Sequence, residues 1–156
     1  MAMNVATSKG RSDAWAWADN PDLGKAFIRV NLGFLLIWHG INFAQGNTNQ
    51  LGALAEIGIP GFVGFPLGIL FEIVCPLLAI LGIYSRLAGL GMAIFMFMAI
   101  ALRHVANGHL FMLEANAQGF FDAYYLERQF FFFWNALALF FMGGGRYGLN
   151  IGGRWN

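Results

Sequence analysis

Four long apolar segments constrain the fold of this chain more than any other feature of its sequence. Each is about 20 residues long, which is the length of helix that crosses the roughly 30 Å hydrocarbon layer of a bilayer. The segments run over residues 21–44, 61–83, 86–105 and about 122–142. With 58% hydrophobic and 11% charged residues, the 156-residue chain has more apolar side chain than one soluble core can bury. We therefore predict an all-α protein, an integral membrane four-helix bundle in contact with the lipid bilayer.

The polar flanks of these segments predict how the bundle lies in the membrane. Residues 1–20 have no apolar stretch or cleavage site of a signal peptide, so we expect them to form a cytoplasmic N-terminal segment. Residues 143–156 would form a cytoplasmic C-terminal tail after the membrane domain of residues 21–142. On a four-span path, six basic residues fall on the side of both termini: Lys9, Arg11, Lys25, Arg86, Arg146 and Arg154. Because cytoplasmic segments are enriched in Lys and Arg, both termini are expected in the cytoplasm.

Local helix signals agree with the predicted start of the first span at residue 21. Asn20 followed by Pro21 is typical of an N-cap and the first helical position, and Asp22 suits the positive end of the helix dipole. The short connection "GIYSR", with Ser85 as a candidate N-cap, predicts that the second and third helices are antiparallel neighbours.

Ionisable residues inside the apolar segments are the first candidates for a functional site. His39 interrupts the run "GFLLIWHGINF" in the outer half of the first span, and Asn42 follows on the same helix face. Glu72 lies near the middle of the second span, where an acidic residue is costly unless it has a partner or a proton. Around Glu72 runs a stripe of small residues, three or four apart, of the kind that packs membrane helices closely: Gly61, Gly64, Gly68, Cys75, Ala79 and Gly82. We therefore expect Glu72 to face the bundle interior.

Three further polar residues lie at the outer ends of the third and fourth spans. Arg103 and His104 end the third span, and Glu127 begins the fourth at the same level. Arg103 and Glu127 are expected to form an interhelical ion pair. Together with the polar residues of the first two spans they would line one pocket that opens to the outside, while Arg29 lies near the inner face. The alternative is a structural role, since residues near span ends commonly snorkel or hydrogen-bond between helices.

Several classes of function are excluded or disfavoured by what the sequence lacks. A net charge of +1 with scattered basic residues argues against nucleic acid as a partner. The only cysteine, Cys75, is expected to pack inside a span, like the run of aromatic residues 130–133. No metal site and no flavin, iron–sulfur or dinucleotide motif is found, and the glycines at 143–145 lack the lysine of a P-loop.

The order of these motifs resembles the DoxX family of small four-helix membrane proteins. The resemblance rests on "RVNLGFLLIWHG", "LFEIVCPLLAILGIYSRLAGL", "AIALRH", "YYLERQ" and "GGGRYGLN", and covers about residues 27–150. The matching positions are Arg29, Gly33, His39, Gly40, Glu72, Gly82, Arg86, His104, Glu127, Gly145, Arg146 and Tyr147. The chain departs from the family at Asn42, which is often lysine, and at Asn150, which is often aspartate. The change at Asn42 removes a positive charge that could bind an anion such as thiosulfate.

The resemblance implies two classes of function, because the family includes the DoxD membrane subunit of thiosulfate:quinone oxidoreductase as well as accessory proteins. In the first, the chain is a quinone-linked redox subunit with Glu72 and His39 as catalytic residues. Glu72 would relay protons, and His39 would donate a hydrogen bond to a quinone carbonyl. The quinone would be bound by His39, Asn42, Glu72, Arg103 and His104, and electrons would come from a substrate or a partner. In the second, the chain is a non-catalytic subunit that stabilises a larger membrane or periplasmic protein, or associates with itself. In either case it belongs in the cytoplasmic membrane of a bacterium or archaeon.

Two other functions are disfavoured. Haem ligation by His39 and His104 would need a haem-sized space between the two histidines, and nothing else in the sequence marks a haem site. Transport of protons or ions through Glu72 has little support in four short spans without repeats or broken helices.

Overall fold

The fold is built almost entirely from helices. The computed structural model describes residues 19–46, 50–56, 58–106 and 117–156, with side chains over the same ranges except at 53, 56, 102–106 and 117–127. The helices are α1 (Pro21–Ala44), α2 (Gln50–Glu56), α3 (Gly61–Ile69), η2 (Leu70–Val74), α4 (Cys75–Leu81), α5 (Ser85–Ala106), α6 (Ala117–Met142) and η3 (Gly153–Trp155). Because α3, η2 and α4 follow one another without a break, they form one long helical rod. Within the described residues, the β-structure is a single parallel bridge between Ile83 and Ile151.

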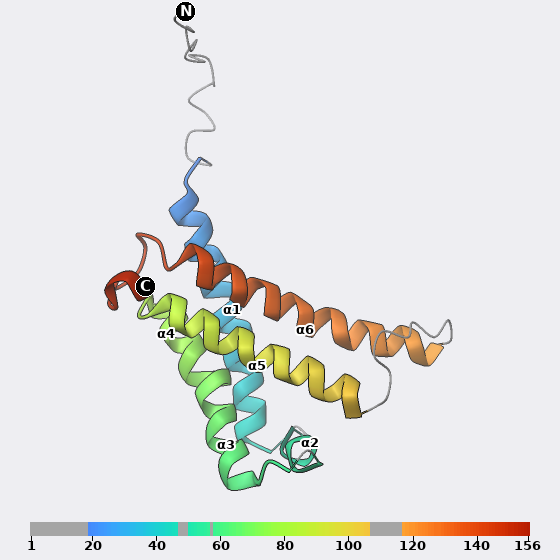
Figure 1. Ribbon diagram of the computed structural model, residues 1–156. Coiled ribbons are helices and arrows are strands. Elements are labelled where there is room, and N and C mark those ends of the chain that lie inside the picture. The colour runs from blue at the N-terminus through green and yellow to red at the C-terminus, as the bar shows by residue number, and fades with distance from the viewer. Residues whose placement is uncertain (1–18, 47–49, 57, 107–116) are drawn as a thin grey trace, which may run out of the picture.

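The long helices associate as two pairs. The helix α1 lies against the α3–η2–α4 rod, and α5 lies against α6 (Figure 1). The two pairs meet through contacts of α5 with α4 and of α6 with α1, close to the start of α1 and the C-terminal segment, and α5 and α6 extend away at an angle (Figure 1). The helix ends that meet at this end of the molecule therefore bring together residues that are far apart in sequence.

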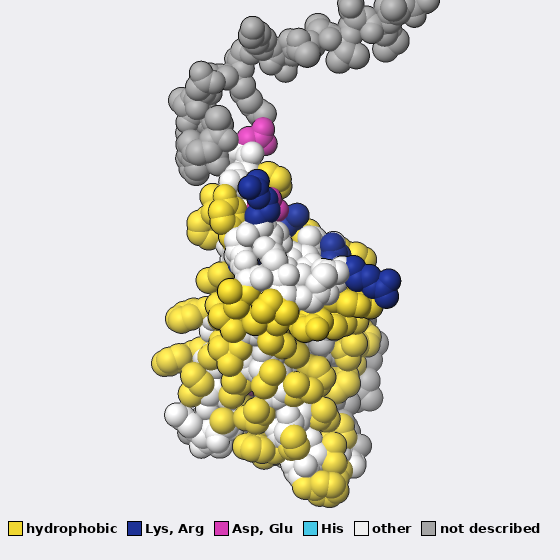
Figure 2. Space-filling model, turned by 90° about the vertical axis from the view of Figure 1, so that its left-hand side faces the viewer, with side chains coloured by type: hydrophobic (Ala, Val, Ile, Leu, Met, Phe, Trp, Pro, Cys, Tyr) yellow, Lys and Arg dark blue, Asp and Glu magenta, His cyan; other side chains and the backbone are white. Residues whose placement is uncertain are grey.

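The exposed surface is that of a helical membrane protein. Two helical stretches, Pro21–Ala44 and Gly61–Leu81, are long and apolar enough to cross a membrane, and Ser85–Ala101 is a shorter apolar helix among the described residues. Large apolar side chains point outward along them: Phe27, Phe34, Trp38, Phe62 and Phe97 are all more than half exposed. Figure 2 shows this apolar surface with the Lys and Arg side chains gathered at one end.

A small apolar core holds the helices together. Leu36 of α1, Ala79 of α4, Met92 of α5 and Leu139 of α6 are fully buried within it. Cys75 is also part of this core, as expected of a packing residue. The core therefore takes one or more residues from each long helix, which holds the two helix pairs together.

The start of α1 confirms the cap that the sequence predicts. The Asn20 side chain accepts a hydrogen bond from the Leu23 backbone N–H (3.0 Å), Pro21 is the first helical residue, and Asp22 lies in the first turn. The α3–η2–α4 rod also has a clear end signal. Gly82, directly after α4, adopts a left-handed conformation (φ +73°) and ends the helix.

One connection and two helix starts differ from the limits that the sequence predicts. The connection between the first two predicted spans includes the short helix α2, in which Leu51 and Leu54 pack against Gly64 of α3. The third helix begins at Ser85, one residue before the expected limit, and the fourth begins at Ala117, five residues earlier. Ser85 donates its backbone N–H and its hydroxyl to the Asn156 side-chain oxygen, so the first turn of α5 is held by a residue 71 positions away.

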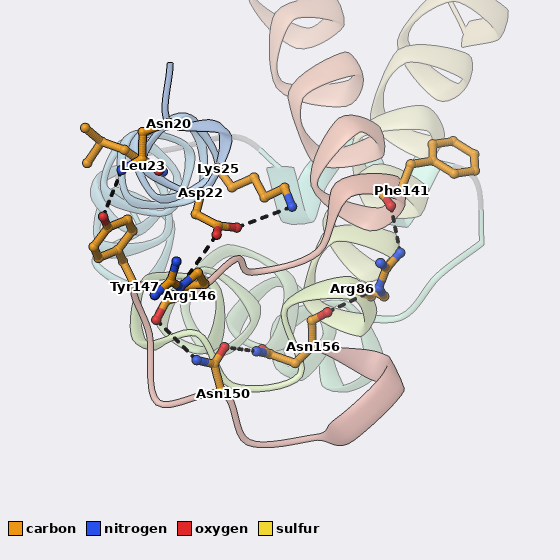
Figure 3. Close-up of polar contacts among 10 residues, drawn as sticks. All are labelled: Asn20, Asp22, Leu23, Lys25, Arg86, Phe141, Arg146, Tyr147, Asn150 and Asn156. Atoms are coloured by element: carbon orange, nitrogen blue, oxygen red, sulfur yellow. Dashed lines mark hydrogen bonds and ion pairs between the residues drawn. The ribbon is translucent and has the colours of Figure 1, made fainter. Parts of the chain in front are cut away.

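The C-terminal segment, residues 143–156, packs across the helix ends (Figure 3). The Leu149 backbone N–H donates to Leu81 O at the end of α4 (2.9 Å), and the Tyr84 backbone N–H donates to Ile151 O (2.8 Å). Asn156 donates to the Asn150 side-chain oxygen, which keeps the segment folded on itself (Figure 3). The hydrogen bond from Leu149 satisfies a carbonyl that the end of α4 leaves unpaired.

Arg86, near the start of α5, connects this helix to α6 and to the C-terminal segment. Its guanidinium donates to Phe140 O (2.9 Å), Phe141 O (2.7 Å) and Asn156 O (3.2 Å). Because the first two are carbonyls in the last turn of α6, we expect Arg86→Gln to lower the free energy of unfolding by about 2 kcal/mol. Unfolding in mixed detergent micelles, followed by far-UV circular dichroism, measures this loss.

A matched control is Arg154→Gln, which removes the same charge from an exposed side chain whose guanidinium lies over the Trp155 ring. It should change stability by no more than about 0.5 kcal/mol. Equal losses in the two variants would mean that the Arg86 hydrogen bonds contribute nothing beyond the charge.

Candidate functional site

His39 and Glu72 come together between α1 and the α3–η2–α4 rod. The Nδ1 atom of His39 lies 3.5 Å from Oε2 of Glu72. The Glu72 side chain is 1% exposed and that of His39 is 33% exposed, so the carboxylate lies behind the imidazole. The prediction that Glu72 faces the interior is therefore confirmed, and the pair combines a buried acidic group with a partly accessible basic one.

Glu72 lies in the π-helical segment η2, which interrupts the rod at this point. Pro76, four residues later, has no backbone N–H and cannot donate to Glu72 O as a regular α-helix would require. The Cys75 N–H instead donates to Leu70 O, five residues back. Single π-turns within helices occur frequently at functional sites. Here the π-turn places a carboxylate inside the protein.

Gly40 lets α1 approach this segment closely. A side chain at Gly40 would meet the Glu72 carbonyl oxygen and lie 2.6 Å from Ile73 Cγ1. One helix heptad earlier, a side chain at Gly33 would lie 2.8 Å from Pro76 O. The two glycines therefore form one face of α1 that packs against the rod, and this close contact sets the distance between His39 and Glu72.

Gln50 of α2 is a third member of the site. Its Nε2 atom lies 3.4 Å from His39 Nδ1, the same ring nitrogen that faces Glu72. If Nδ1 carries a proton, it faces the Glu72 carboxylate as a donor. If it does not, it accepts a hydrogen bond from Gln50 Nε2. The Nδ1 atom can thus act as a donor to Glu72 or as an acceptor from Gln50, depending on which ring nitrogen carries the proton.

Two buried oxygen atoms of this site accept no hydrogen bond of good geometry from the described residues, although Glu72 Oε2 lies 3.5 Å from His39 Nδ1. The two atoms are Glu72 Oε2 and Gln50 Oε1. Buried polar atoms are normally hydrogen-bonded, so each of these oxygens can accept a hydrogen bond from a bound ligand or a water molecule. Within the described residues, no three His, Cys, Asp or Glu side chains gather as a metal site would require.

The other predicted site residues lie apart from the pair or outside the described side chains. The Asn42 side chain donates to Trp38 O of its own helix (3.0 Å), and no described contact joins it to His39 or Glu72. Arg103 and His104 lie in α5 and Glu127 in α6, but their side chains are outside the described residues, and so is the expected ion pair.

Arg29 lies at the other end of the membrane helices, where the C-terminal segment packs. Its side chain is 2% exposed and donates to Ala79 O of α4 (3.5 Å). Gly82 and Gly148 lie so close to the guanidinium that a side chain at either position would collide with it. Arg29 is therefore part of the helix-end packing and not of the His39–Glu72 site.

Gln50 is the residue of this site that the sequence did not single out. It follows several uncharged polar residues in the connection between the first two predicted spans, so only its polarity marks it. The π-turn had a clearer signal, since Pro76 lies four residues after Glu72.

Comparison with known proteins identifies the family. The DoxX family model matches residues 24–105, more than half of the chain, from the first turns of α1 almost to the end of α5. Neither the curated proteins nor the solved structures gave a match. The matched region includes His39, Gly40 and Glu72, and it confirms the resemblance seen in the sequence. This helical membrane protein belongs to the DoxX family.

Proposed function

We propose that this chain is a membrane subunit of a quinone-linked redox system, similar to thiosulfate:quinone oxidoreductase. The observation that supports the proposal is the His39–Glu72 pair, 3.5 Å apart, with the imidazole partly exposed and the carboxylate buried. Such a pair can donate a hydrogen bond outward while it exchanges a proton with the interior. A structural ion pair would not need one partner to remain accessible.

The two residues would have different roles. Because His39 Nδ1 faces Glu72 and Gln50, the other ring nitrogen, Nε2, is the atom that would donate to a quinone carbonyl. A bound quinone would supply the two-electron, two-proton acceptor. Glu72 would relay a proton behind the imidazole, since its buried Oε2 atom lies 3.5 Å from His39 Nδ1. The electrons would come from a substrate oxidised by a partner subunit.

The proposal includes a four-helix bundle with both termini in the cytoplasm. Its support is the position of the described basic residues, because Lys25 lies near the start of α1, Arg86 near the start of α5, and Arg146 and Arg154 in the C-terminal segment. Figure 2 shows Lys and Arg side chains gathered at one end of the molecule. His39 is five residues before the opposite end of α1. In a bacterial or archaeal cytoplasmic membrane the site would then lie in the outer half of the bilayer.

An accessory role without catalysis is the second candidate. The observation that favours it is the row of exposed aromatic side chains on α6, where Phe131, Trp134 and Phe141 are each at least half exposed. A larger membrane or periplasmic protein, or a second copy of this chain, would pack on such a face. His39 and Glu72 would then serve only to join α1 to the rod.

Quinone bound after gentle purification tests the proposal. The full chain is purified in mild detergent as wild type, His39→Ala and Glu72→Gln, and the quinone per protein is measured by mass spectrometry. We expect quinone in the wild type and an approximately tenfold loss in His39→Ala, because one hydrogen bond to a ligand is worth about 1.4 kcal/mol. Glu72→Gln should lose less, since the amide still supports the imidazole but cannot supply a proton.

Asn135→Ala is the matched control, because Asn135 is a polar residue of α6 that donates to Phe131 O of its own helix. It should retain quinone like the wild type. A wild-type sample without quinone that instead carries a larger protein in fixed stoichiometry would overturn the redox proposal and favour the accessory role.

A further inference from the structure

The basic residues at the end where the C-terminal segment packs form a second surface of interest. We call Lys25, Arg86, Arg146 and Arg154 the basic rim. In Figure 2 the Lys and Arg side chains lie at one end of the molecule, beyond most of the apolar surface. Asp22 is shared by Lys25 (3.5 Å) and Arg146 (3.9 Å), and Asp19 is the other acidic residue described near the start of α1. The rim therefore carries a net positive charge.

Two cations of the basic rim remain open to the surroundings. The Arg146 side chain is 87% exposed although it approaches Asp22, and Arg154 is exposed with its guanidinium 5.2 Å from the centre of the Trp155 ring. Arg86, by contrast, uses its donors on backbone carbonyls. Arg146 and Arg154 are thus the members of the rim that an external anion can reach.

The backbone that carries these arginines is held in place. Asn150 donates to Arg146 O (3.3 Å), and the neighbouring Tyr147 hydroxyl accepts a hydrogen bond from Asn20 at the start of α1 (2.9 Å). Figure 3 shows this part of the segment lying across the helix ends. An anion would therefore meet guanidinium groups on an ordered segment, and binding would cost little backbone entropy.

Apolar side chains flank the same arginines. Tyr147, Leu149, Ile151 and Trp155 of the C-terminal segment are each at least 40% exposed. At the adjoining helix ends, large side chains are also exposed: Phe27 of α1, Leu81 of α4, Leu87 of α5 and Phe141 of α6. Aromatic residues together with cations at the edge of an apolar surface are typical of the level of lipid headgroups.

We propose that the basic rim binds the phosphate groups of anionic phospholipids in the leaflet on this side of the membrane, with Arg146 and Arg154 as the main contacts. A guanidinium matches the geometry of a phosphate and can donate two hydrogen bonds to it. The exposed apolar residues beside it accommodate the upper part of the acyl chains. Zwitterionic lipid offers the same phosphate with its charge neutralised, so the site distinguishes lipids by net charge.

The test counts lipids bound to the full chain in detergent by native mass spectrometry. Delipidated wild-type protein is titrated with phosphatidylglycerol or with phosphatidylcholine of the same acyl chains. We expect phosphatidylglycerol to bind about tenfold more tightly, and each of Arg146→Gln and Arg154→Gln to weaken it about fivefold. The double variant should lose the preference for phosphatidylglycerol.

Three controls separate this site from other causes. The double Lys variant, Arg146→Lys with Arg154→Lys, should keep most of the preference because it keeps both charges. Arg128→Gln removes one exposed arginine on α6, outside the rim, and should leave phosphatidylglycerol binding unchanged. Inorganic phosphate at the lipid concentration should not compete. Equal binding of the two lipids, the same loss in Arg128→Gln, or full competition by inorganic phosphate would each overturn the proposal.

Discussion

Gly40→Ala is expected to lower the free energy of unfolding by about 3 kcal/mol and to separate His39 from Glu72. The added methyl group would overlap the Glu72 carbonyl oxygen and lie 2.6 Å from Ile73 Cγ1 and 2.8 Å from the Glu72 carbonyl carbon. Since two of these atoms are backbone atoms inside a helical rod, they cannot rotate away, and α1 must move instead. Unfolding in mixed micelles measures the loss of stability, and quinone content measures the loss of the site.

Gly24→Ala is the matched control in the same helix. Nothing lies within 4 Å of the position that its added methyl group would occupy. It should leave stability unchanged or raise it by up to about 1 kcal/mol, because alanine has the higher helix propensity. If Gly40→Ala were as stable as Gly24→Ala, α1 would not approach the rod at Glu72 as closely as the structure indicates.

The helices themselves could be predicted because their signals are local. Asn20, Pro21 and Asp22 define the start of α1 within three consecutive residues, and the observed helix begins at the same point. The burial of Glu72 could also be predicted, since a carboxylate within a stripe of small residues on an apolar helix has only the interior as a favourable surrounding. Both predictions rest on the physics of one segment at a time.

The pairings that build the site could not be predicted because they join distant segments. Asn42 has a suitable position on the first helix, yet its amide donates to Trp38 O, one turn earlier in the same helix. Gln50 reaches His39 only because α2 folds back against Gly64, and this packing depends on Leu51 and Leu54. No spacing within one segment shows which of several polar residues will meet a partner.

The C-terminal segment illustrates the same limit at the other end. Its glycines and polar residues are typical of a tail, and no local pattern distinguishes a free tail from a packed one. It packs because the ends of α4, α5 and α6 leave backbone groups unpaired, and Leu149, Arg86 and Asn156 take part in satisfying them. The packing of the C-terminal segment depends on how the ends of three helices lie in space, and the sequence of the segment alone does not contain this information.

Gly82→Ala is expected to destabilise the protein by about 3 kcal/mol through two separate effects. Gly82 has φ +73°, a backbone conformation that costs an L-residue about 1 kcal/mol. In addition, its methyl group would collide with the Arg29 guanidinium and lie 2.8 Å from Gly148 Cα. The long side chain of Arg29 would ordinarily move aside, but at 2% exposure it has no free space to enter. Unfolding in mixed micelles measures the total.

Gly46→Ala isolates the first effect, because Gly46 has nearly the same φ (+74°) with nothing within 4 Å of the added methyl group. It should cost only about 1 kcal/mol. The remaining cost at Gly82 is then the collision, and it should shrink when Gly82→Ala is made in an Arg29→Ala background, where the guanidinium is absent. If instead the cost of Gly82→Ala is the same with and without Arg29, the two residues are not coupled, and Arg29 does not occupy the space between α4 and the C-terminal segment.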